Sequence, residues 1–125
     1  MARFAAIFVL LAALMSAGPA AATSGWGCFR VVNVESWDVL NMRFGPSAST
    51  TIVGTIAPQD HGIIALNSRT GILDNVNDAI ALEAQTCVPA ERALTSRWCH
   101  VTHYTGGGTT IGWVSRRYLE RVECP

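Results

Sequence analysis

The sequence predicts an all-β domain in which five or six short strands form a small barrel. Two observations support this fold class. Short runs of apolar and β-branched residues follow one another closely, and residues that favour turns separate most of them. A single stretch, residues 67–97, has a different character. Short strands at close spacing are typical of barrels, so we expect one barrel that is interrupted by one longer excursion.

The first 22 residues are expected to be an export signal and not part of the fold. Arg3 is the only charge ahead of twelve consecutive apolar residues at 4–15, a run too short to span a bilayer. Small residues follow up to Ala22, as at a signal-peptide cleavage site. Cleavage there would leave one domain of 103 residues, 23–125, in the periplasm or outside the cell.

Apolar and polar residues alternate in the first half of this domain. Four strands are expected at residues 29–34, 39–44, 51–56 and 61–66. In the second of these, Leu40, Met42 and Phe44 share one face, and Gly45 then begins a turn. This face is expected to point into the barrel.

Residues 67–97 do not alternate in this way. The segment 73–83 is compatible with either a pair of strands or a helix. In 89–97, Pro89 occupies a first-turn position and Glu91 follows closely, so this segment predicts one short helix.

The end of the domain again predicts strands. A glycine-rich turn at residues 105–109 joins the β-rich segments 98–104 and 110–114 into a hairpin. A single 3₁₀ turn within 115–120 and a last short strand at 121–123 are expected to complete the barrel.

Four cysteines lie in the domain, and an even number in a small exported protein predicts disulfide bonds. Three pairings are possible. The positions favour Cys28 with Cys124, which would tie the two ends of the domain, and Cys87 with a partner at Cys99, which would close a local excursion. Zinc is the alternative, but no Cys-x-x-Cys pair exists, and adjacent Cys99 and His100 would point to opposite faces of a strand. We therefore expect two disulfides, no metal and no cofactor.

Two blocks of the sequence resemble the bacterial SH3-like (Src-homology-3, SH3b) domain family of exported proteins. Residues 38–47 read DVLNMRFGPS, similar to the family's D-x-L-N-V-R-S-G-P-S, and 52–56 are similar to its V-x-G-x-I/L. Residues 98–104 and 112–119 are similar to the family motifs W-C-x-V-x-Y and G-W-V-x-x-x-Y-L. The resemblance implies an SH3-like barrel in which residues 67–97 form an insertion longer than the family's loop.

The resemblance also implies a groove, lined by aromatic rings, that binds a peptide or a cell-wall component. The residues in matching positions are Trp37, Trp98, Tyr104, Trp113 and Tyr118. Trp98 is the strongest candidate, because it lies three positions before Val101 and so on the opposite face from the core. The alternative for each ring is that it only packs within the barrel.

The mature domain carries eight arginines against nine acidic residues, which excludes a large basic footprint for nucleic acid. Catalysis is not expected, because paired cysteines leave no thiol and the three histidines form no recognisable constellation with a nucleophile. The sequence thus predicts an exported, non-enzymatic binding module without a membrane span after signal cleavage, whose ligand is a peptide, a protein partner or peptidoglycan. The alternative is a secreted inhibitor or accessory subunit that acts through residues 67–97.

Overall fold

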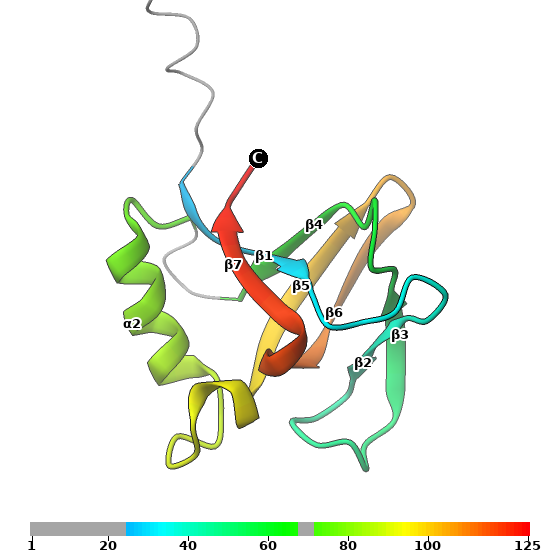
Figure 1. Ribbon diagram of the computed structural model, residues 1–125, viewed down its shortest axis with the longest axis horizontal. Coiled ribbons are helices and arrows are strands. Elements are labelled where there is room, and N and C mark those ends of the chain that lie inside the picture. The colour runs from blue at the N-terminus through cyan, green and yellow to red at the C-terminus, as the bar shows by residue number, and fades with distance from the viewer. Residues whose placement is uncertain (1–24, 68–71) are drawn as a thin grey trace, which may run out of the picture.

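The computed structural model describes residues 25–67 and 72–125, so the expected signal peptide lies outside the described residues. The described chain forms seven strands, one α-helix and two 3₁₀ turns (Figure 1). The strands are β1 (Trp26–Val31), β2 (Leu40–Arg43), β3 (Ile52–Ile56), β4 (Ile63–Leu66), β5 (Trp98–Thr105), β6 (Gly108–Ser115) and β7 (Leu119–Glu123). The helical elements are α2 (Val76–Thr86), η1 (Leu94–Ser96) and η2 (Arg116–Tyr118).

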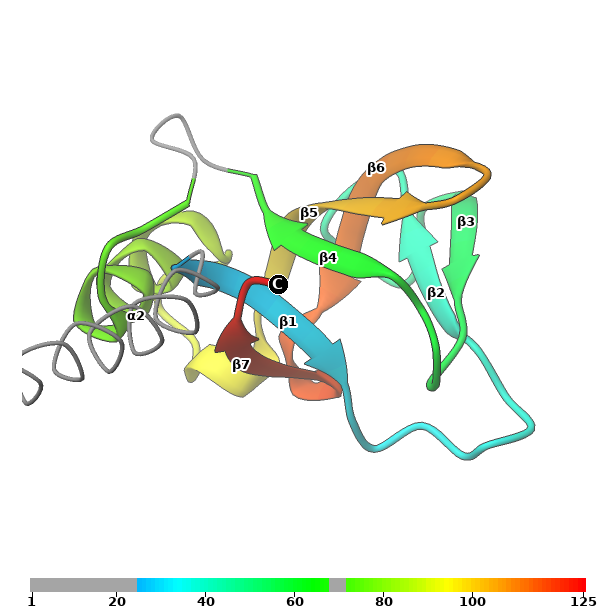
Figure 2. The same ribbon diagram turned by 90° about the horizontal axis from the view of Figure 1, so that it is seen from above.

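All seven strands pair antiparallel in one sheet, in the order β3-β2-β6-β5-β4-β1-β7. The all-β character is therefore as predicted, with seven strands in place of five or six. The expected hairpin of β5 and β6 is present, with pairing from Trp98 opposite Ser115 to Thr105 opposite Gly108. The sheet is coiled, so that the β2–β3 hairpin lies at one end of the molecule and α2 at the other (Figure 2).

The core occupies the inner face of the coiled sheet. Buried apolar residues from all seven strands meet there, among them Phe29, Leu40, Ile56, Ile64, Val101, Val114 and Leu119. Leu40 and Met42 are both in this core, as their alternation predicts. Phe44 was expected on the same face but is 76% exposed. Strand β2 ends at Arg43, so the alternation no longer applies at Phe44, whose backbone N–H donates to the Thr51 carbonyl in the turn that follows.

The helix of the insertion lies at α2 and not at residues 89–97, so the predicted position was wrong. Asn75 caps α2, because its side chain accepts a hydrogen bond of 2.9 Å from the backbone N–H of Asp78. Within 89–97 there is only the 3₁₀ turn η1. The Arg97 guanidinium donates to the carbonyls of Ala84, Ala90 and Arg92, and a loop shaped around this side chain replaces the expected helix.

Helix α2 is attached to the sheet by a buried charge cluster. Ala79 and Glu83, one turn apart, are the buried residues of the helix. Glu83 is only 1% exposed, and its two carboxylate oxygens accept hydrogen bonds from Arg116 at 2.6 Å and Arg121 at 2.5 Å. Each charge therefore has a partner of opposite sign, as burial requires.

Both expected disulfide pairings are present. Cys28 on β1 is bonded to Cys124, just after β7, with a Cα–Cα distance of 5.1 Å. Cys87, the C-cap residue just after α2, is bonded to Cys99 on β5 with a Cα–Cα distance of 4.3 Å. No cysteine is free in the described chain, so the thiolate ligands that a zinc site would need are absent there.

Candidate functional site

A groove of about 480 Å³ lies over neighbouring strands β2, β6 and β5, and the core residue Leu40 is part of its lining. Its floor comes from three neighbouring strands, through Asn41 on β2, Ser115 on β6 and Trp98 on β5. One wall is the loop that follows β1, and the other is the η2 turn with Tyr118. The groove thus gathers residues that are far apart in the sequence.

Strand register explains why the three floor residues share a face. Trp98 is directly opposite Ser115 in the β5–β6 pair. The β2–β6 pair places Arg43 opposite Trp113, and Asn41 and Ser115 each lie two residues from this pair, on the same face of their strands. Because side chains alternate along a strand, these residues face outward while their neighbours pack in the core.

Trp98 is held in place by the insertion. Its backbone N–H and carbonyl both bond to Val88, at 2.6 and 2.9 Å, so that the segment after α2 pairs with the start of β5. The adjacent Cys99 is covalently tied to Cys87, and the adjacent Arg97 holds the three carbonyls described above. The insertion therefore fixes the backbone of Trp98 from both sides.

The loop wall is tied to η2. The backbone N–H of Val32 donates to the Tyr118 carbonyl at 2.9 Å, and the Asn33 side-chain amide donates to the Arg117 carbonyl at 3.1 Å. The Arg117 guanidinium lies 5.9 Å from the centre of the Tyr118 ring, within reach of a cation–π contact. These contacts keep the two walls close at one end of the groove.

The groove carries charges of both signs. Glu35 and Asp38 lie on the loop wall, and Arg43 and Arg117 lie at the floor and at η2. Asp38 is oriented by a bond of 2.8 Å from the Val39 backbone N–H to its carboxylate. Arg43 donates one N–H to the Thr50 carbonyl at 3.0 Å, so its guanidinium too has a defined position. A ligand with both donors and acceptors would find partners here.

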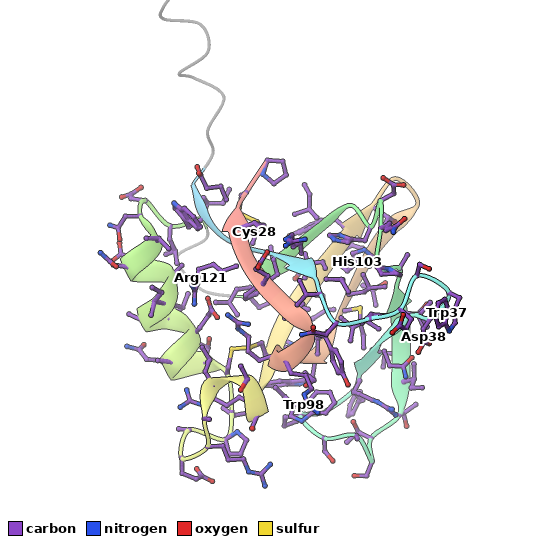
Figure 3. All side chains as sticks on the ribbon, viewed as in Figure 1. Cys28, Trp37, Asp38, Trp98, His103 and Arg121 are labelled. Carbon is purple, nitrogen blue, oxygen red and sulfur yellow. A yellow bond between two sulfur atoms is a disulfide. The ribbon has the colours of Figure 1, made fainter. Side chains whose placement is uncertain are left out.

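The structure brings together two of the five aromatic residues expected at a binding groove. Trp98 and Tyr118 both line it. Trp113 lies beyond the floor and packs against His100 on β5. Tyr104 is at the far end of β5, where it helps to line a separate, more apolar pocket of about 440 Å³. Trp37 is 81% exposed and does not line the groove (Figure 3 shows it well away from Trp98).

Sequence reasoning missed most of the polar groove residues. Asn41 and Arg43 alternate with the core residues of β2, so the same pattern that predicted the core also marks them as outward. Ser115 and Arg117 carry no comparable signal, because only the pairing of β5 with β6 and the turn at η2 bring them to the groove.

Neighbouring His100 has a defined environment. Its ring centre lies 4.8 Å from that of Trp113, with the planes tilted by 33°. Its Nδ1 lies 3.2 Å from the side-chain amide nitrogen of Asn67. Burial lowers the pKa of His100 from its ordinary value of 6.5, because it disfavours the charged form. The imidazole is thus neutral at neutral pH.

Two further properties concern the described residues as a whole. Among them, no group of three or more His, Cys, Asp or Glu side chains is placed to hold a metal ion. In the same part of the chain, no helix is long and apolar enough to cross a membrane.

Comparison with known proteins adds no relative: no family model, no curated protein and no solved structure matches this chain.

Proposed function

We propose that this protein is an exported, non-enzymatic binding module with an SH3-like barrel, and that the groove between the loop after β1 and η2 is its ligand site. The observation that carries the proposal is the convergence of Trp98 and Tyr118, twenty positions apart in the sequence, on one open groove with charged groups on its walls. Aromatic faces beside paired donors and acceptors are typical of recognition sites.

The sequence blocks that resemble the SH3-like family support this assignment. Their buried residues account for much of the core, and their outward residues meet at the groove: Asn41 and Arg43 come from the first block, and Trp98, Ser115 and Tyr118 from the second. The first and last strands, β1 and β7, pair with each other, and the short η2 turn precedes the last strand, an arrangement that supports an SH3-like domain.

The groove suits an extended ligand. It is only partly enclosed, and its lining offers ring faces, amides and both charge signs. A peptide, a segment of a protein partner or peptidoglycan has groups that match this lining. The two disulfides, together with the signal peptide expected from the sequence, support a location in the periplasm or outside the cell.

A pair of matched substitutions tests the groove. We expect Trp98→Ala to weaken binding of the purified protein to intact sacculi or to a partner from periplasmic extract by about tenfold or more, because a central aromatic anchor is lost. Trp37→Ala is the control, since it removes the same side chain from an exposed position outside the groove. Circular dichroism and thermal unfolding would show that both variants are folded. Full binding by folded Trp98→Ala would contradict the proposal.

The alternative is an inhibitor or accessory subunit that acts through residues 67–97. The observation that favours it is Ile80, an apolar residue that is exposed on α2. If this surface binds the partner, Ile80→Glu should abolish binding while Trp98→Ala leaves it intact. If the groove is the binding site, Trp98→Ala should weaken binding and Ile80→Glu should leave it intact.

A further inference from the structure

A second row of side chains runs beside the floor of the groove, on the same face of the sheet. It crosses four adjacent segments, from Arg43 on β2 through Trp113 on β6 and His100 on β5 to Asn67 after β4. Arg43 is paired with Trp113, Trp113 is paired with His100, and the Asn67 backbone N–H donates to the His100 carbonyl at 2.9 Å. All four side chains are half-buried, as are the three floor residues, so the two rows form one continuous outer surface. We call this second row the platform.

The platform has a fixed hydrogen-bond polarity. The Thr102 hydroxyl donates to Oδ1 of Asn67, so this oxygen is an acceptor and the amide nitrogen Nδ2 faces His100. Nδ2 can only donate, and therefore Nδ1 of His100 accepts. The proton of the neutral imidazole must then be on Nε2. No described residue accepts a hydrogen bond from this Nε2–H, and in the described part of the chain no buried side-chain nitrogen lacks a partner, so Nε2 lies at the surface.

The two rows together carry a single formal charge. Arg43 is the only charged residue in the two rows, and part of its guanidinium is already bonded to the Thr50 carbonyl. The other groups are two indoles, one neutral imidazole, two amides and one hydroxyl. The acidic residues of the site, Glu35 and Asp38, belong to the loop wall and not to the platform. Its chemistry therefore complements a neutral, polar ligand with flat apolar faces.

A sugar ring has these properties. Its axial C–H groups present an apolar face to an aromatic ring, and its hydroxyl and acetamido oxygens accept hydrogen bonds at the edge. A peptide offers no comparable flat face except at proline or at aromatic side chains.

We propose that the ligand site continues from the groove onto the platform, and that the platform binds one ring of a neutral saccharide through contact with Trp113 and a hydrogen bond from His100 Nε2–H. This inference rests on the proposed function, because it identifies the class of ligand that the same face recognises. Asn67 is a positioning residue in it: it holds the imidazole in the tautomer that donates.

The test is a titration of the purified, isotopically labelled protein with an oligosaccharide, followed by NMR. The probe is the β-1,4-linked tetramer of N-acetylglucosamine, and deca-L-proline is the comparison ligand. We expect the saccharide to shift the indole N–H signals of Trp113 and Trp98 and the ring signals of His100. Absence of these shifts at millimolar saccharide, or the same shifts with deca-L-proline alone, would overturn the assignment to a saccharide.

Two variants separate the roles of the platform residues. His100→Phe keeps an aromatic ring against Trp113 but removes the donor, and should weaken saccharide binding about tenfold, the value of one well-placed hydrogen bond. Asn67→Asp removes the amide donor, and should move the His100 proton to Nδ1, which long-range ¹H–¹⁵N correlation spectra report directly. Unchanged affinity in folded His100→Phe would overturn the role of Nε2–H.

The same variants distinguish this inference from the proposed function. If Trp98→Ala abolishes binding to sacculi while His100→Phe and Trp113→Ala bind normally, the groove is the ligand site and the platform is not part of it. If Trp98→Ala binds normally, the groove itself is excluded, whatever the platform variants do. Trp37→Ala is again the control for Trp98→Ala and Trp113→Ala, because it removes an indole from outside the groove and the platform.

Discussion

The two regions that border the groove are held in very different ways. The loop after β1 depends on a few hydrogen bonds to η2, and its tip carries the exposed Trp37. The insertion that supports Trp98 is fixed by a disulfide, by a buried carboxylate between two arginines and by a guanidinium that bonds three carbonyls. One side of the groove is thus fixed by covalent and buried ionic contacts and the other by fewer, weaker contacts, so we expect the loop wall to adjust more readily. A site of this kind can keep one aromatic anchor in place while the opposite wall adjusts to the ligand.

The largest effect is expected from the buried charge of the insertion. Glu83→Gln leaves Arg116 and Arg121 without their carboxylate partner, and should lower the free energy of unfolding by about 3 kcal/mol or more. Chemical denaturation measures the change. The control is Glu120→Gln, which breaks the ion pair with Arg30 between side chains that are 56% and 51% exposed, and should cost less than about 1 kcal/mol. Equal losses would mean that the insertion is not anchored through Glu83.

The disulfide of the insertion should have the next largest effect. Replacing Cys87 and Cys99 together by alanine opens a loop that spans 12 positions and should cost about 3 kcal/mol in the chain-entropy description. Because the same segment holds the Trp98 backbone, ligand binding should weaken as well. Asn33→Ala is the comparison in the loop wall, where loss of one exposed hydrogen bond should cost about 1 kcal/mol. Unfolding curves and a sacculus-binding assay on the same samples would show whether the insertion affects binding more than the loop wall does.

The smallest effect concerns His100, which lies two residues after Trp98 on β5. Burial lowers its pKa in the folded protein below 6.5, so the unfolded chain binds more protons at this position as the pH falls. The contribution of His100 to stability is therefore complete above pH 6.5 and is lost as the pH falls from there through the lower pKa of the folded protein. His100→Phe should lose less stability than the natural protein over this range. Parallel pH dependences of the two proteins would show that burial of the imidazole has no effect on stability.

Local sequence patterns predicted the parts of the fold that depend on neighbours in the chain. Alternation identified Leu40 and Met42 as core residues, and a glycine-rich turn identified the β5–β6 hairpin. For residues 73–83 the choice between a helix and a pair of strands stayed open, because the periodicity of this segment is ambiguous, and the structure has α2 there. The cap of Asn75 on Asp78 was a readable signal that would have favoured the helix.

Other features depend on contacts between distant residues. Glu83 is buried only because Arg116 and Arg121 reach it from 33 and 38 positions away, and no local pattern reports this. The groove also depends on contacts between residues that are distant in the sequence. Trp98 could be identified as outward from its own strand, but its meeting with Tyr118, and the separation of Trp37 and Tyr104 from both, follow from strand order and the coil of the sheet.

The bond between Cys28 and Cys124 has a mechanical consequence. It joins β1 to the residue that follows β7, so nearly the whole described domain lies between its two cysteines. Tension applied to the two ends of the domain passes from one strand to the other through this covalent link. The sheet and the groove between the cysteines then bear no load. A force applied along the chain therefore does not deform the groove around a bound ligand. A force applied to the ligand would still act on the groove.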